Sequence, residues 1–220
     1  GNVTVASGTT LTLAPGTTVD AKAYAIYVDG ALVAEQATFF SSVVPETQGS
    51  HGQGLWPGIV VEPGGQANLT ETVVANASAG VLVRGAFNGT DVVFNDAYRG
   101  LSVMGGAAEV SGMEAHRMDY EAIYVASGTL HANDVLAREV AVGLANHGQS
   151  NLTDLTVQEA GVGVQSQAGS MNLSGLNVHN ASVGFATVSG ASTLLDTFTG
   201  TGLALAIDAG NADDFSLGNE

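Results

Sequence analysis

The chain has 220 residues, 45% of them hydrophobic, and carries 21 acidic residues against five basic ones, which gives a formal net charge of -16. Recognition of nucleic acid needs clustered Lys and Arg to neutralise phosphates, so this composition excludes nucleic acid as an expected partner. A membrane-spanning helix needs about 20 consecutive apolar residues, which the chain lacks, and the absence of cysteine excludes disulfides and thiol catalysis.

The N-terminal part, residues 1–54, predicts short strands followed by a loop. In residues 3–19 apolar residues alternate with Thr and Ser and are interrupted by Ser-Gly and Pro-Gly pairs, a pattern typical of short strands joined by turns. Residues 25–40 repeat it. Residues 41–54, SSVVPETQGSHGQG, are polar and rich in turn formers, and we expect an insertion loop between rungs there rather than a domain linker.

A repeat of about 20 residues begins at Leu55. Each repeat unit contains a small residue directly before a strand with a V-x-V-like pattern. These small residues mark the repeat and are 18 to 23 residues apart. The marks are Gly80, Gly100, Ala122, Ala141, Gly161, Gly184 and Gly202. A nearly constant period over seven units is typical of a solenoid, in which each unit stacks on its neighbours.

Each unit predicts three short strands, and parallel stacking of such units describes a β-helix. We therefore predict an all-β fold, a right-handed parallel β-helix of roughly ten rungs of about 20 residues, because the variable period favours three unequal faces. One domain covers 1–220, with N-terminal rungs and loop in 1–54, regular rungs in 55–210 and a C-terminal tail in 211–220.

Alternation along the first strand of each unit predicts which residues are buried. The expected inward pairs are Val81 and Val83, Leu101 and Val103, Ile123 and Val125, Val142 and Leu144, and Val162 and Val164. Trp56, at the start of the regular rungs, is expected to be a packing residue rather than a ligand platform.

A second column in the repeat alternates between acidic residues and glycine. It contains Glu71, Asp91, Gly112, Asp134, Asp154, Gly175 and Asp196. A stripe of calcium ligands would not place Gly in the same column twice, whereas a bend with a left-handed backbone favours Gly, Asn and Asp. We predict bend residues and no cofactor. Calcium bound along the remaining carboxylates is the alternative.

Three segments resemble the beginning of right-handed parallel β-helix proteins of the pectin-lyase-like superfamily. They are V-x-S-G-T-T-L-T-L-x-P-G-T-T-V, I-x-V-D-G-A-L-V-A and L-W-P-G-I-V-V. The resemblance implies the fold over essentially the whole chain. Lyases of this superfamily use an Arg or Lys base with calcium-binding carboxylates, and the polygalacturonase-like hydrolases carry ordered NTD, DD, HG and RIK-like motifs. Here Asp213-Asp214 follows His147-Gly148, and no R-x-K occurs.

The variable turns before each small residue hold the candidate site. We expect a ligand-binding patch there, because aromatic faces can stack on sugar rings and Arg can pair with uronate carboxylates. The patch comprises Tyr98, Arg99, Arg117, Tyr120, Arg138 and Glu139. Tyr98, Tyr120 and Glu139 each stand two residues before the small residue of their rung, so we expect them to form one column with Tyr98 stacked over Tyr120. If the protein is an enzyme, the catalytic candidates are Asp96, His116, Arg117, Asp119 and Glu121. The alternative is that these arginines only form local ion pairs with neighbouring acids. No metal-ligand spacing of histidines is present.

The leading interpretation is a non-catalytic extracellular or cell-surface β-helix module that acts as a spacer or binds a polysaccharide or surface glycan. Seven N-x-S/T sequons favour export, although turn chemistry explains those that recur in the repeat, such as Asn68, Asn151 and Asn172. A carbohydrate-active enzyme, lyase or hydrolase, acting on an anionic polysaccharide is the alternative. A structural segment of a larger surface protein is a third. The acidic charge predicts a marine or salt-adapted source. We expect no membrane insertion, because a long apolar run is lacking.

Overall fold

The computed structural model describes residues 1–43, 56–188, 191–195, 197–201, 205–207 and 215–217. These residues form strands joined by turns, and none of them is in a helix. The strands are β1 (Val3–Val5), β2 (Thr10–Leu13), β3 (Thr18–Asp20), β4 (Ile26–Val28), β5 (Ala31–Glu35), β6 (Thr38–Phe40), β7 (Ile59–Val61), β8 (Gln66–Thr70), β9 (Val73–Ala75), β10 (Ala79–Val83), β11 (Ala86–Thr90), β12 (Val93–Ala97), β13 (Arg99–Asn146), β14 (Gln149–Ser166), β15 (Gly169–Thr187), β16 (Ala191–Leu195), β17 (Phe198–Thr201), β18 (Leu205–Ile207) and β19 (Phe215–Leu217).

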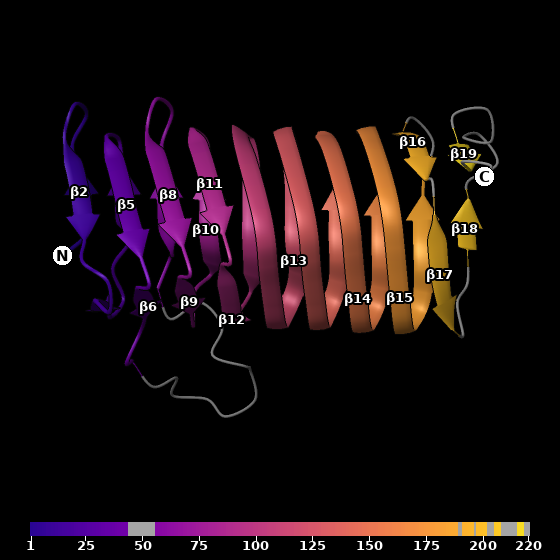
Figure 1. Ribbon diagram of the computed structural model, residues 1–220, viewed down its shortest axis with the longest axis horizontal. Coiled ribbons are helices and arrows are strands. Elements are labelled where there is room, and N and C mark those ends of the chain that lie inside the picture. Colours follow the sequence, from indigo (N-terminus) through magenta and orange to yellow (C-terminus); the bar gives the residue numbers. More distant parts are fainter. Residues whose placement is uncertain (44–55, 189–190, 196, 202–204, 208–214, 218–220) are drawn as a thin grey trace.

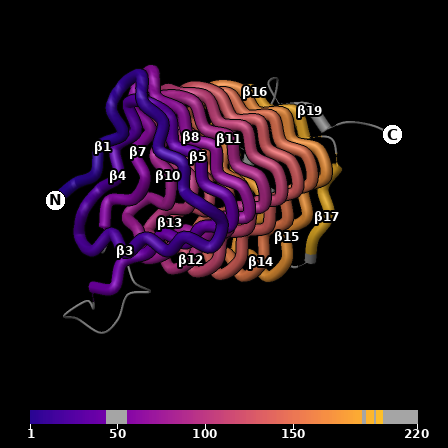
Figure 2. Tube along the Cα trace, turned by 60° about the vertical axis from the view of Figure 1, so that its left-hand side comes forward, coloured from indigo at the N-terminus to yellow at the C-terminus, as the bar shows by residue number. Residues whose placement is uncertain are grey.

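The strands coil into a right-handed parallel β-helix, as the repeat predicted, with about nine turns where roughly ten were expected. One rung consists of β10, β11 and β12, and each of these pairs in parallel with the equivalent strand of the rungs before and after it. Figure 1 shows the rungs side by side along the long axis, and Figure 2 shows the coils stacked behind one another. Strands β13 to β15 each contain straight segments joined at left-handed bends, and β13, with 48 residues, extends over more than one rung.

The core lies inside the coil and is built of stacked apolar columns. One column carries a fully buried residue in each rung, namely Ile59, Val81, Leu101, Ile123, Leu144, Val164 and Phe185. Trp56 is 1% exposed, and its indole Nε1 donates a hydrogen bond to the carbonyl of Ala75 at 2.8 Å. The prediction that Trp56 is a packing residue is therefore confirmed.

The acidic and glycine column is a bend with a left-handed backbone, as predicted. The residues with positive φ are Glu71 (47°), Asp91 (51°), Gly112 (69°), Asp134 (55°), Asp154 (57°) and Gly175 (71°). A second left-handed column, which the sequence pattern did not reveal, lies between the third strand and the next rung. It contains Asn76, Asp96, Arg117, Glu139, Glu159 and Asn180. Each described regular rung is thus shaped by two such bends, which sets the places where side chains project outward.

The register of the first strand differs from the prediction in two rungs. Val162 pairs with Val183, so Gly163, and not Gly161, occupies the position of Gly184. In the preceding rung the backbone amide of His147 donates a hydrogen bond to the carbonyl of Val125. The backbone amide of Arg84 makes the equivalent hydrogen bond to the carbonyl of Val61 in an earlier rung. Gly143, and not Ala141, is therefore the small residue of that rung, and Val142 and Val162 are half-buried rather than inward.

Two predicted segments fall largely on residues outside the described ranges. Of the expected insertion loop 41–54, the structure describes residues 41–43. Of the expected tail 211–220, it describes β19, which pairs in parallel with β16 through Thr193 and Phe215 and so adds a further strand to the stack.

Candidate functional site

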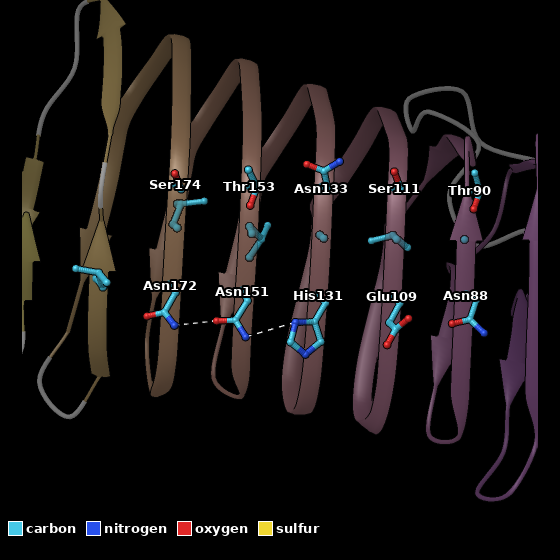
Figure 3. A pocket seen from close by; sticks show the side chains of 16 residues that line it. Asn88, Thr90, Glu109, Ser111, His131, Asn133, Asn151, Thr153, Asn172 and Ser174 are labelled. Carbon is cyan, nitrogen blue, oxygen red and sulfur yellow. Dashed lines mark hydrogen bonds between the residues drawn. The ribbon is translucent and has the colours of Figure 1, made fainter. Parts of the chain in front are cut away.

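A polar groove of about 840 Å³ runs along the outer surface of the second strand of each rung. It crosses five successive rungs, from β11 to β15, and ends at Leu194 of β16 (Figure 3). Its two rows of outward side chains are Asn88, Glu109, His131, Asn151 and Asn172, and Thr90, Ser111, Asn133, Thr153 and Ser174. Between the rows lies the strand backbone of inward-pointing residues such as Val110, Leu152 and Leu173, whose side chains are buried. The groove is therefore long and open, with polar side chains along both sides and the strand backbone between them.

The first row is an amide ladder held by hydrogen bonds along the helix axis. Asn88 Nδ2 donates to Asn68 Oδ1 at 2.8 Å, and Asn172 Nδ2 donates to Asn151 Oδ1 at 2.8 Å. Asn151 Nδ2 lies 3.4 Å from His131 Nδ1. Because each amide is held by the rung beside it, the row presents donors and acceptors in fixed positions toward the groove.

The spacing of Asn and Thr in the repeated N-x-T sequences indicates this row of outward side chains. In N-L-T or N-G-T the Asn and Thr are two residues apart, so on a strand they point to the same face while the middle residue points inward. Leu69, Gly89, Leu152 and Leu173 are indeed buried. Turn chemistry as the explanation for the recurring sequons at Asn68, Asn151 and Asn172 is therefore wrong, because these residues lie within strands β8, β14 and β15.

The charges at the groove are acidic. Glu109 is exposed within the first row, and the bend residues Asp91, Asp134 and Asp154 directly follow the second-row residues and are exposed. No Lys or Arg is among the residues that line the groove. The surroundings of the groove are therefore suited to a neutral partner and repel an anionic one.

Tyr98 and Tyr120 form the tyrosine step, a stacked pair on the turn that leads into the first strand of a rung. Their ring centroids are 5.2 Å apart and their planes differ by 12°. Tyr98 is 37% exposed and Tyr120 is 45% exposed. The predicted stacking of these two rings is confirmed, and they lie on a different side of the rung from the polar groove.

Arg99 lies against the tyrosine step and is held by a nearly buried acid. Its Nε is 2.5 Å from Glu121 Oε2, and the Glu121 side chain is 6% exposed. The Arg99 guanidinium carbon is 4.4 Å from the ring centroid of Tyr124 and 5.4 and 5.5 Å from those of the step tyrosines. Burial lowers the pKa of Arg99, but the hydrogen bond and charge of Glu121 outweigh it and the net shift is upward.

Arg117 and Glu139 belong to the second left-handed column and not to the tyrosine column. Arg117 binds Asp96 through two parallel hydrogen bonds, of 2.6 Å from Nε and 2.8 Å from Nη2. The hydrogen bond from Arg117 to Asp96, followed by the charges of Asp96 and Glu139, raises the pKa of the guanidinium. Arg138 lies 3.6 Å from Glu139 and 3.2 Å from Glu159. The predicted patch is thus crossed by ion pairs between neighbouring rungs.

The expected continuation of the tyrosine column through Glu139 is wrong. Three residues before the buried column residues Leu101, Ile123, Leu144 and Val164 stand Tyr98, Tyr120, Ala141 and Gly161. The column therefore passes from two aromatic rings to two exposed small residues. The cause is the two-residue register difference described above.

His116 and Asp119 are the remaining catalytic candidates. His116 pairs with Glu114, with 2.9 Å between Nε2 and Oε2, on the third strand of its rung. Asp119 is half-buried and directly precedes Tyr120. Within the described ranges, no group of three or more His, Asp or Glu side chains is placed to hold a metal ion. The described strands and turns also include no helix long and apolar enough to cross a membrane.

Comparison with known proteins gives a likeness of fold. No known family profile matches the chain, and the search for similar curated proteins gave no match. Among solved structures 11 chains match. One is the catalytic unit of a thermostable GH87 α-1,3-glucanase from Streptomyces thermodiastaticus, with a TM-score of 0.42 and 10% sequence identity over 100% of this chain and 68% of that one.

Proposed function

We propose that this protein is a non-catalytic extracellular β-helix module that binds a linear, uncharged glycan along the polar groove, without a cofactor. The observation that carries the proposal is the pair of polar rows that continues over five rungs. Amide and hydroxyl groups along both rows can exchange hydrogen bonds with sugar hydroxyls, and the exposed side chain of Leu194 at one end can contact the C–H face of a ring.

The period of the groove also supports an extended polymer. Rungs of a parallel sheet lie about 4.8 Å apart, which is comparable with the length of one hexose unit in an extended chain. A polymer lying along the axis would therefore meet a similar set of groups at each sugar unit. A compact ligand would use only a small part of the five rungs.

The charges favour an uncharged glycan over the anionic polysaccharide of the alternative interpretation. All five basic residues pair with acids: Lys22 with Asp20, Arg84 with Glu62, Arg99 with Glu121, Arg117 with Asp96, and Arg138 with Glu159. None of them lines the groove, which carries Glu109. A uronate polymer would meet a negative surface with its possible counterions already engaged.

Binding is also better supported than hydrolysis. Glycoside hydrolases commonly use two carboxyl groups that flank the scissile bond, about 5 to 9.5 Å apart. Glu109 is the one carboxylate among the side chains that line the groove. At the turn, the acids Asp96 and Glu121 are engaged with arginines.

Isothermal titration with hexasaccharides tests the proposal. Neutral β-linked glucose and N-acetylglucosamine oligomers are compared with oligogalacturonate, and the solutions are then analysed for new reducing ends and double bonds. We expect saturable binding of at least one neutral oligomer, weaker binding of oligogalacturonate and no new ends. Turnover of the anionic oligomer that disappears in Arg117→Ala would instead support the enzyme interpretation.

Two matched variants locate the binding. Thr153→Trp places a large ring at an exposed position in the groove, and Thr4→Trp makes the same change at an exposed position of β1. We expect the first to weaken binding at least tenfold and the second to leave it unchanged. Equal binding by both variants would place the glycan elsewhere, and absence of binding to any oligomer would favour a spacer.

A further inference from the structure

The tyrosine step ends at an open ring face. Tyr98 covers one face of Tyr120, yet Tyr120 is 45% exposed. The next residues of the column, Ala141 and Gly161, are exposed and too small to cover the other face. The stack of rings thus stops at Tyr120 while the column itself continues for two further rungs.

The space over Ala141 has the dimensions of one more ring. Successive column positions are about 4.8 Å apart, and the two tyrosine rings stack with 5.2 Å between centroids. A planar or chair-shaped ring at the Ala141 position would therefore contact Tyr120 as Tyr98 does. Half-buried Val142 and Val162 lie directly beside the small residues and supply an apolar backing.

Polar groups stand at the rim of this space. Glu139 and Glu159 occupy left-handed bend positions two residues before Ala141 and Gly161, and both are exposed. Arg138 connects them through its contacts to both carboxylates. Such a rim can accept hydrogen bonds from hydroxyl groups at the edge of a ring whose face rests on Tyr120.

We infer that the open face of Tyr120, above Ala141 and Gly161, is a second binding position, which takes a single neutral hexose ring of the gluco configuration. When the ring hydroxyls are all equatorial, both faces of the sugar present C–H bonds, as stacking on a tyrosine requires. Each axial hydroxyl makes the face on which it lies polar, so a sugar with axial hydroxyls on both faces offers no apolar face. The site lies apart from the polar groove and does not depend on the function proposed for it.

The test is a nuclear magnetic resonance titration of tyrosine-labelled protein with methyl β-glucopyranoside. We expect saturable shifts of the Tyr120 ring signals, smaller shifts of Tyr98, and none of Tyr24, which is 46% exposed near the N-terminus. The methyl altropyranoside, with axial hydroxyls on both faces, is expected to bind about fivefold more weakly.

Two variants make the inference falsifiable. Ala141→Tyr extends the ring stack by one position and fills the site with the protein's own side chain, so the fold is kept while sugar binding is lost. Tyr120→Ala removes the face, and binding is expected to weaken at least fivefold. The groove variant Thr153→Trp should bind the monosaccharide as the unchanged protein does. If the Tyr120 ring signals of the Ala141→Tyr variant still shift with the sugar, or if the Tyr24 signals shift as much as those of Tyr120, the inference is overturned while the groove proposal stands.

Discussion

The carboxylate of Asp91 lies over Gly112, in the place where a side chain of Gly112 would begin. A Cβ at Gly112 would be 2.2 Å from Asp91 Oδ1, and a Cβ at Gly175 would be 2.4 Å from Asp154 Oδ1. The bend column therefore places glycine directly after an aspartate that leans along the axis. Gly112 and Gly175 thus leave room for the carboxylates of Asp91 and Asp154.

Replacement of Gly112 by Ala should cost more stability than replacement of a glycine with the same backbone but open surroundings. Gly64 has φ of 85° and no atom within 4 Å of an added Cβ, so Gly64→Ala is expected to cost about 1 kcal/mol. Gly112→Ala should cost about 2 kcal/mol, because the Asp91 carboxylate must also move. Urea unfolding measures both. Asp91→Ala should cost less unfolding free energy in the Gly112→Ala variant than in the unchanged protein. Fully additive effects of the two substitutions would mean that Asp91 does not obstruct a side chain at position 112.

The buried ion pair of Arg99 should matter more than an exposed one. Glu121→Ala leaves a guanidinium that is 28% exposed among tyrosine rings without its counter-charge, and we expect a loss of about 2 to 3 kcal/mol. The matched change Glu62→Ala breaks the more exposed pair with Arg84 and is expected to cost less than about 1 kcal/mol. Thermal unfolding of the two variants gives the comparison. Equal effects would mean that burial does not strengthen the first pair.

Asn146 replaces an apolar residue in the core, yet restoring the apolar pattern should destabilise the protein. Its side chain is fully buried, donates to carbonyls of Gly148, Ala168 and Ser170, and accepts from Ser150 at 2.6 Å. Asn146→Val leaves these groups without that partner and is expected to cost about 2 kcal/mol in denaturant unfolding. Ser166→Ala, which removes only the acceptor of the hydrogen bond from Thr193, should cost about 1 kcal/mol. A more stable Asn146→Val variant would contradict this account.

Stability of the N-terminal rungs should fall in acid. Hydrogen bonds from the side chains of Lys22 and Ser42 hold the pKa of Asp20 well below its ordinary value. A carboxyl with a lowered folded-state pKa stabilises the fold above its unfolded pKa of about 4, and that stabilisation is lost as the pH falls below it. Amide hydrogen exchange of β3 at pH 6 and pH 3 measures this effect. Asp20→Asn should reduce the difference between the two pH values, and an unchanged difference would exclude Asp20 as its source.

The stacking of Tyr98 on Tyr120 should appear as a coupling energy. In a double-mutant cycle with Ala at both positions we expect about 1 kcal/mol of coupling, typical of aromatic pairs. The same cycle between Tyr120 and Tyr24 serves as the control and should give none. A coupling near zero for the stacked pair would mean that the contact of the rings adds nothing to the stability of the turn.

The repeat allowed the fold, the three strands per rung and the first bend to be predicted, because alternation and the Asp/Gly column act locally. It failed at the first strand of two rungs. A shift by two residues keeps every side chain on the same face, so AGVGV fits two registers equally well. In the predicted register the last inward residues of these two strands are Leu144 and Val164. In the structure the inward run continues through Asn146 and Ser166, whose burial depends on partners from other rungs.

The candidate site could be predicted only in part from the sequence. The stacking of Tyr98 on Tyr120 followed from the period of the repeat, and it is confirmed. The pairing of Arg117 with Asp96 depends on two side chains 21 residues apart meeting at a bend, and the sequence left it open against ligand binding. The groove was missed because Asn and Thr were interpreted as turn formers, although their spacing of two residues fits a strand.

The amide ladder makes the groove a one-dimensional array. Asn151 has a hydrogen-bonding neighbour on each side along the axis, His131 and Asn172. A change at one row position is therefore felt by the adjacent rung and fades beyond it, as in other stacked-repeat proteins. Each rung can consequently be altered almost independently, so the chemistry along the groove can be changed one position at a time without redesign of the scaffold.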